Sequence, residues 1–188
     1  MNDLENFSKD TYPVNLTVSL SKLEEVEEEI QKRLKEKKFL PLNKLYDTIN
    51  EKIYRNIEAF DKLGYAANEQ SKNSNSLNEF KGLYIFCDGD KPVYIGISRS
   101  VFRRLRQHGW GSKHNQCSLA YLIAKYKNGD IERSTVHKIH EVELETQKKV
   151  IRNYNVLLYP VSCNYELYFL EVALAIKLKT YWNSFKTH

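Results

Sequence analysis

Two tyrosines and a cluster of arginines lie close together in residues 81–107 of this 188-residue chain. Tyr84 and Tyr94 belong to two apolar runs separated by an Asp-Gly-Asp turn signal, which is the pattern of a β-hairpin. If residues 88–90 form the turn, the two tyrosines lie directly opposite each other and their rings interact. Phenols beside guanidinium groups are suited to binding a phosphate, because arginine donates several N–H bonds to phosphate oxygens.

A basic helix is predicted directly after this hairpin, from Ser98 or Ser100 to about His108. Its apolar side comes from Val101, Phe102 and Leu105. Arg104 and His108 are four residues apart and therefore share one face of the helix.

Glu171 is the second residue whose position suggests chemistry. It lies in a strongly apolar predicted helix, residues 165–181, between Leu170 and Val172. An ionised carboxylate buried there without a partner costs several kcal/mol. We therefore expect Glu171 to face a cation, which is either a lysine or arginine side chain or a metal ion.

These residues together resemble the GIY-YIG endonuclease superfamily. The resemblance consists of Gly82-Leu83-Tyr84, then Tyr94-Ile95-Gly96 after nine intervening residues, then Arg104, Glu171 and Asn183. The nine-residue gap is slightly shorter than is usual in that family. The resemblance covers residues 80–185. The lack of a recognisable zinc finger or helix-turn-helix motif favours a restriction-like or stand-alone member.

The resemblance implies hydrolysis of phosphodiester bonds in DNA, with one divalent cation, Mg²⁺ or Mn²⁺. The implied catalytic residues are Tyr84, Tyr94, Arg104, His108, Glu171 and Asn183. By analogy, Glu171 is the metal ligand and Arg104 holds the scissile phosphate. Tyr84 is the general base or positions the attacking water, with Tyr94 beside it. His108 assists through the phosphate or a proton, Asn183 orders the site, and Gly96 allows close approach of the backbone.

Charge is divided unevenly along the chain. Residues 1–80 carry 12 Lys+Arg against 15 Asp+Glu, whereas residues 81–188 carry 17 against 9. This asymmetry favours a polyanionic partner for the second part. The resemblance implies DNA as that partner, and RNA is the alternative. The expected DNA-contacting cations are Lys91, Arg99, Arg103, Arg106 and Lys113.

We expect an α+β fold, with a small antiparallel or mixed three-stranded sheet flanked by helices. The polar stretch 71–78 suggests a boundary between a mostly helical N-terminal region, residues 1–78, and a nuclease domain, residues 79–188. In the N-terminal region the apolar spacing predicts one helix from Ser21 and a second from near Pro41. Its acidic balance suggests packing, dimerisation or regulation and not contact with DNA.

Several alternatives remain open at this stage. Glu143 and Asn155 have the same spacing as Glu171 and Asn183, so Glu143 could be the metal ligand instead. The pairs His114/Cys117 and His137/His140 have zinc-ligand spacing, but they enclose a predicted core helix. A non-catalytic nucleic-acid-binding or scaffold module that keeps the nuclease fold is the alternative function.

The cellular context is also an expectation from composition. Three scattered cysteines argue against a disulfide framework, and no apolar run is long enough to span a membrane. We expect a cytoplasmic protein without a membrane partner. Cutting both strands at a palindrome would require a homodimer or transient pairing.

Overall fold

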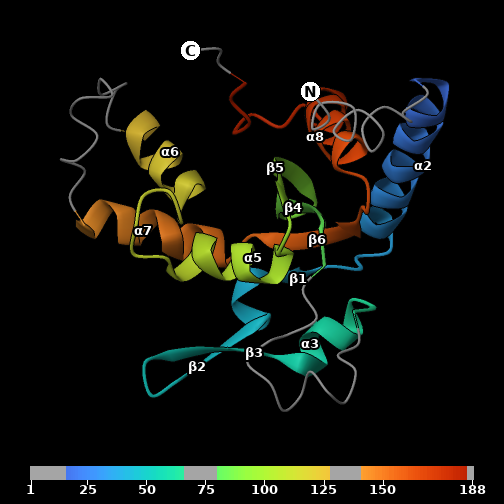
Figure 1. Ribbon diagram of the computed structural model, residues 1–188. Helices are drawn as coiled ribbons and strands as arrows, with labels where there is room; N and C mark the ends of the chain where they lie inside the picture. Colours follow the sequence, from blue (N-terminus) through green and yellow to red (C-terminus); the bar gives the residue numbers. More distant parts are fainter. Residues whose placement is uncertain (1–15, 66–79, 128–140, 186–188) are drawn as a thin grey trace, which may run out of the picture.

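The computed structural model describes residues 16–65, 80–127 and 141–185. These residues form six α-helices, a four-stranded antiparallel sheet and a two-stranded sheet, so the fold is α+β (Figure 1). The helices are α2 (Leu16–Lys35), α3 (Ile57–Lys62), α5 (Val101–Trp110), α6 (Ser118–Lys127), α7 (Glu141–Arg152) and α8 (Asn164–Lys177). The strands are β1 (Leu40–Pro41), β2 (Tyr46–Ile49), β3 (Lys52–Arg55), β4 (Gly82–Asp88), β5 (Lys91–Ser98) and β6 (Asn155–Pro160), and η1 (Leu42–Lys44) is a 3-10 helix.

The main sheet has the strand order β1-β6-β4-β5, with every neighbouring pair antiparallel. The expectation of three strands was incomplete, because β1 from the N-terminal region adds a fourth at the edge of β6. Leu40 pairs with Val156 and Pro41 with Asn155. Two residues that include a proline are too short for a recognisable strand pattern, and proline is tolerated there because β1 is an edge strand.

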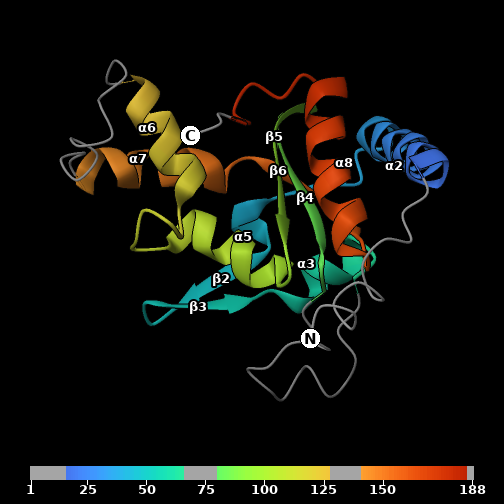
Figure 2. The same ribbon diagram turned by 45° about the horizontal axis from the view of Figure 1, so that its top comes forward.

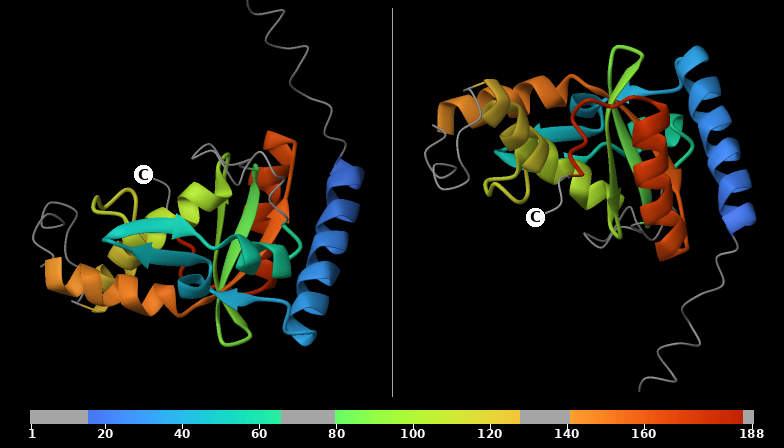
Figure 3. Two further views of the ribbon diagram at one scale, coloured as in Figure 1. Left: turned by 90° about the horizontal axis from the view of Figure 1, so that it is seen from below. Right: turned by 90° about the horizontal axis from the view of Figure 1, so that it is seen from above.

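Helices cover both faces of this sheet (Figures 2 and 3). Helices α5, α6 and α7 lie on one face, where Phe86 of β4 shares a core with Leu105 and Ile123. Helices α8 and α2 lie on the other face, where Ile85 shares a second core with Leu170. Adjacent residues of β4 therefore belong to different cores, as expected from the alternation of side chains along a strand.

Helix α2 confirms the apolar helix predicted for the N-terminal region, but it begins at Leu16 and not at the predicted Ser21. Leu23, Val26 and Ile30 are buried in the core that α8 also lines, and Glu27 forms an ion pair with Lys177 of α8. The N-terminal region thus contributes both a helix and a strand to the layers around the main sheet. The predicted division at residue 78 stays a prediction, and the polar stretch on which it rests lies outside the described residues.

The predicted second helix from Pro41 was wrong. After the short η1 helix the chain forms the hairpin β2–β3, with Tyr46 opposite Arg55 and Ile49 opposite Lys52. Its two-residue turn places Asn50 at φ 48° and Glu51 at φ 63°. Positive φ at both turn positions suits the twist of a tight hairpin. The apolar spacing after Pro41 fits both a helix and a hairpin, and Ile49, which the predicted helix would have turned toward the core, is exposed.

The three cysteines are free, and Cys87 and Cys117 are buried. Among the described helices, none has both the length and the apolar character of a membrane-spanning segment.

Candidate functional site

The register of the β4–β5 hairpin differs from the expected one. The turn contains two residues, between Asp88 and Lys91, and a bulge near Phe86 shifts the pairing further along. Tyr94 consequently lies opposite Phe86, and Tyr84 lies opposite Gly96. The two tyrosines are therefore diagonal neighbours, with ring centroids 6.2 Å apart. The two-residue turn and the bulge together decided this outcome, because each residue gained or lost in one strand shifts the cross-strand pairs beyond it.

Gly96 makes room for the ring of Tyr84. A Cβ atom at position 96 would lie 2.3 Å from both Cζ and Oη of Tyr84. The tyrosine ring therefore lies across the backbone of β5 at a position that only glycine allows. The sequence resemblance assigned this glycine to approach of a backbone, whereas in this structure the close neighbour is a side chain of the same hairpin.

Tyr84 and His108 form a buried polar pair. The Tyr84 Oη lies 2.8 Å from His108 Nε2, and the two side chains are 1% and 0% exposed. Burial raises the pKa of the Tyr84 phenol well above its ordinary value; Tyr94 raises it further and Arg104 opposes the shift. Burial, together with the positive Arg104, lowers the pKa of His108 well below its ordinary value. Both groups are therefore neutral near pH 7, and Tyr84 has no direct contact with solvent.

The Arg104 guanidinium is oriented by the loop that joins α5 to α6. Nη1 donates to the carbonyl oxygens of Asn115 and Gln116, both at 3.0 Å, and Nη2 donates to Ser118 Oγ at 2.7 Å. Guanidinium has five N–H donors, so these bonds leave two for other acceptors. Because Arg104 also affects the pKa values of Tyr84, Tyr94 and His108, its charge acts on all three rings.

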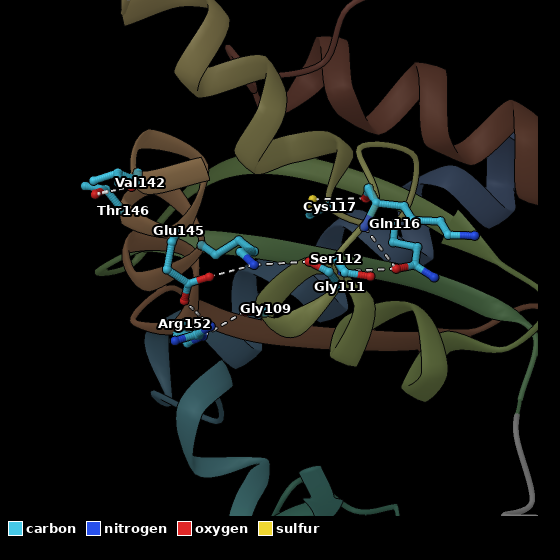
Figure 4. A network of polar contacts seen from close by, with 11 residues as sticks. Gly109, Gly111, Ser112, Gln116, Cys117, Val142, Glu145, Thr146 and Arg152 are labelled. Atoms are coloured by element: carbon cyan, nitrogen blue, oxygen red, sulfur yellow. Dashed lines mark hydrogen bonds and ion pairs between the residues drawn. The ribbon is translucent and has the colours of Figure 1, made fainter. Parts of the chain in front are cut away.

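A polar network fixes the end of α5 from which this loop begins (Figure 4). Arg152 of α7 donates to the carbonyl oxygen of Gly109, and Lys148 donates to that of Gly111. Glu145 pairs with both cations, at 2.6 Å from Lys148 and 2.7 Å from Arg152. Cations on the last carbonyls of a helix complement its dipole. Helix α7 therefore holds the C-terminal end of α5, and with it the loop that orients Arg104.

Glu171 lines a cavity of about 290 Å³ on the side of β5 that faces α6. Tyr94, Ser118 and Asn183 line the same cavity. Burial raises the pKa of Glu171 to about 7, and in the described part of the chain no hydrogen bond or ion pair to this carboxylate offsets that shift. Burial raises the pKa of Tyr94; the positive Arg104 opposes this shift and Glu171 adds to it. Tyr94 thus lies within the field of both charges.

Asn183 attaches the segment after α8 to the edge strand β5. Its Nδ2 donates to the carbonyl oxygen of Ile95 at 2.7 Å, and its Oδ1 accepts from the Ile95 N–H at 2.9 Å. Thr180 Oγ1 donates to the same Oδ1, and the backbone N–H of Trp182 donates to the carbonyl oxygen of Val93. The amide thereby pairs with both backbone groups of Ile95, which would otherwise be open on the edge strand. This pairing brings the residues after α8 to the cavity wall.

The six expected catalytic residues accordingly fall into two connected groups. Tyr94, Glu171 and Asn183 line the cavity, while Tyr84 and His108 lie buried behind Tyr94. Arg104 is joined to the cavity through Ser118, which sequence reasoning did not select. The only sequence signal for Ser118 was its position at the start of a predicted helix.

The alternative ligand Glu143 does not line this cavity. Its Oε1 accepts a hydrogen bond of 2.7 Å from Gln147 on the same helix, α7. Its expected amide partner, Asn155, donates to the carbonyl oxygen of Gly89 and so supports the hairpin turn.

Within the described ranges no group of three His, Cys, Asp or Glu side chains is arranged to hold a metal ion. His137 and His140 of the zinc alternative lie outside those ranges, and Cys117 is buried.

The cations expected to contact DNA are all exposed side chains around the hairpin and α5. They are Lys91, Arg99, Arg103, Arg106 and Lys113. Lys91 lies at the β4–β5 turn, with its Nζ 5.6 Å from the ring centroid of Tyr181. Comparison of the chain with protein-family models, curated proteins and solved structures found no match.

Proposed function

We propose that this protein is a divalent-metal-dependent endonuclease of the GIY-YIG type that hydrolyses phosphodiester bonds in DNA. The observation that carries the proposal is the cavity lined by Tyr94, Glu171 and Asn183, with Arg104 held at its edge through Ser118. These residues come from the hairpin, two helices and the C-terminal segment, so their sequence spacing alone does not bring them together. A phenol, a carboxylate and a guanidinium around one cavity suit a phosphodiester substrate.

Glu171 is the residue that would hold the cation. Mg²⁺ commonly binds proteins through one or two carboxylates and completes its coordination with waters and substrate phosphates. A carboxyl whose pKa is raised by burial, without an offsetting partner in the described residues, fits such an ion. When bound, Mg²⁺ or Mn²⁺ would polarise the phosphate and stabilise the leaving oxygen.

The protein's own groups account for orientation and charge. Arg104 is oriented by three hydrogen bonds and also acts on the Tyr84 hydroxyl, so a remaining N–H donor can meet the charge that develops on the phosphoryl oxygens without reorganisation. Tyr94 is the phenol that lines the cavity and can position the attacking water. Tyr84 and His108 lie behind it as a neutral buried pair, which supports a positioning role for them. Asn183 holds the C-terminal segment against β5.

DNA is the proposed substrate because exposed cations surround this site. Helix α5 presents Arg103 and Arg106 to solvent, and Arg99, Lys91 and Lys113 extend the positive surface on either side. Lysine and arginine contacts with phosphates supply most of the non-specific affinity for DNA. Cleavage of both strands would involve two copies of the chain.

A second candidate function is supported by a specific observation. Tyr84 is buried, three donors of Arg104 are bound within the protein, and Glu171 is the only acidic residue among those that line the cavity. The same features suit a module that binds nucleic acid without cutting it. Catalysis is favoured because a half-buried carboxylate without a partner in the described residues costs free energy that a bound cation would offset, whereas binding of nucleic acid makes no use of a carboxylate.

A plasmid-nicking assay distinguishes the two functions. The wild type should nick supercoiled DNA in Mg²⁺ and not in EDTA. Glu171→Gln should abolish nicking while DNA binding persists. Glu143→Gln is the matched control and should retain the wild-type rate, because its carboxylate contacts Gln147 and not the cavity. DNA binding without nicking by the wild type in Mg²⁺ or Mn²⁺ would favour the binding module, and full nicking by Glu171→Gln would exclude this carboxylate as the ligand.

A further inference from the structure

A second and larger cavity lies between the β2–β3 hairpin and helix α5. It has a volume of about 750 Å³, and its walls also include the loop that follows α5. Figure 2 shows the hairpin running below α5, on the side away from β5. We refer to this cavity as the hairpin groove. The hairpin belongs to the N-terminal region, whose net negative charge gave no reason to expect contact with DNA.

The hairpin groove is lined by cations from both of its sides. Lys52 and Arg55 come from β3, and Arg103 and Arg106 come from α5. No aspartate or glutamate is among its lining residues. Lys52 and Arg106 bring positive charge from opposite walls, and the lining contains no acidic residue, so the groove is complementary to a polyanion although β3 belongs to a region that is acidic overall.

The groove also contains aromatic surface. Tyr54 of β3 and Trp110 of α5 line it, and Tyr54 is 45% exposed. The guanidinium carbon of Arg55 lies 3.9 Å from the ring centroid of Phe102, so the charged end of Arg55 stacks against α5. Basic side chains interleaved with exposed rings are the usual composition of a groove that follows a nucleic-acid strand.

One loop separates this groove from the candidate site. Gly111, Ser112 and Gln116 line the groove, and Ser118 at the end of the same loop lines the cavity of Glu171. Arg104 donates to Gln116 and to Ser118, so one guanidinium connects the walls of both. A bound strand that leaves the site over this loop would therefore enter the groove.

We propose that the hairpin groove binds the sugar–phosphate backbone of DNA beside the site of cleavage. The proposal rests on the proposed endonuclease function and extends its DNA-binding surface to the N-terminal hairpin. In this arrangement Lys52 and Arg106 contact phosphates from opposite walls, and Tyr54 packs against the sugars or an exposed base. The hairpin thus lengthens the contact with DNA beyond the surface of α5.

The test is DNA binding in EDTA, measured by fluorescence anisotropy with a labelled duplex of several helical turns at a series of salt concentrations. Lys52→Glu should weaken binding on the order of tenfold. It should also reduce the slope of log K against log salt concentration by about one, the value for one phosphate contact. Tyr54→Ser should weaken binding with little change in the salt dependence. The matched control is Lys32→Glu, which reverses an exposed charge on α2 at the far side of the sheet and should bind as the wild type.

Arg106→Glu is a second variant that does not depend on correct folding of the hairpin, because it lies on α5. Weaker binding by both charge reversals supports the groove. Wild-type affinity in both would overturn it, even if the wild type cuts DNA. Groove-dependent binding by a wild type that never cuts DNA would instead overturn the endonuclease function and leave the groove in place.

Discussion

The Tyr84 hydroxyl and His108 Nε2 lie 2.8 Å apart within the protein interior, without solvent contact. His108 Nδ1 has no hydrogen-bond partner among the described residues. The pair is neutral because burial raises the pKa of Tyr84 and lowers that of His108. It therefore connects β4 to α5 at the level of the candidate site through one polar contact in an otherwise apolar core.

Removing the Tyr84 hydroxyl should destabilise the protein. Tyr84→Phe leaves both nitrogens of His108 unpaired, and an unsatisfied buried polar group costs about 1–3 kcal/mol. Urea denaturation of the variant and the wild type at pH 7 measures this difference. A free energy of unfolding equal to that of the wild type would show that the hydrogen bond contributes nothing to stability.

Gly96→Ala should displace the Tyr84 ring. Because the new Cβ would lie 2.3 Å from Cζ and Oη of Tyr84, we expect destabilisation of about 1–3 kcal/mol, as for other overpacked cores. The same substitution in a Tyr84→Leu background should cost less, since the colliding atoms are absent. Thermal unfolding of the four proteins gives the coupling energy. Additive effects would contradict the predicted collision.

Arg104→Lys should reduce both catalytic rate and stability while keeping the positive charge. A single ammonium cannot reach the two carbonyl oxygens and Ser118 Oγ in the geometry of a guanidinium. Under the proposed function, kcat should fall by about 10²-fold, the usual loss for an oriented transition-state donor. Steady-state cleavage and thermal unfolding measure the two effects. Arg103→Lys, on the exposed side of α5, is the control for helix charge, and an Arg104→Lys enzyme with wild-type kcat would count against an oriented guanidinium.

Asn183→Asp should release the C-terminal segment from β5. A carboxylate cannot donate to the Ile95 carbonyl, so that oxygen loses its partner and faces a negative charge. Hydrogen exchange at the Ile95 amide should accelerate, and the fluorescence of Trp182 should change as its neighbourhood loosens. Thr180→Val removes one hydroxyl contact to the same amide oxygen and should have a smaller effect. Unchanged exchange at Ile95 in Asn183→Asp would refute the edge pairing.

The raised pKa of Glu171 predicts how stability depends on pH in EDTA. The folded-state pKa is about 7, against 4.5 for an ordinary carboxyl, so the folded protein binds a proton that the unfolded chain releases. The stabilisation from Glu171 is complete below pH 4.5 and is lost as pH rises to about 7. With allowance for partial solvation, the loss is on the order of 1–2 kcal/mol.

Glu171→Gln should remove this contribution and be relatively more stable at pH 8 than at pH 4.5. Denaturant unfolding of both proteins across this range isolates the effect as their difference. Parallel pH profiles would mean that the carboxyl titrates alike in the folded and unfolded states.

The sequence predicted the helices that carry a continuous apolar stripe. Two such helices were confirmed, α2 with its stripe of Leu23, Val26 and Ile30 and the apolar α8. Each buries its apolar side chains against the core of the main sheet. The strand β6 and the central hairpin were predicted from their local apolar patterns, because alternate residues of a strand face opposite sides of a sheet. The segment after Pro41 was not, since its spacing fits a hairpin as well as a helix, and the two-residue turn at Asn50 and Glu51 decided between them.

For the site, the sequence by itself determined which residue types were available and that a carboxylate would lie in an apolar helix. Only the tertiary structure decided which of them meet. Glu171 and not Glu143 lines the cavity with Tyr94, because α8 packs against the main sheet while Glu143 bonds to Gln147 on α7. The hairpin register was likewise a tertiary outcome: a two-residue turn and one bulge placed Tyr84 over Gly96, and residue spacing along the chain does not encode either one.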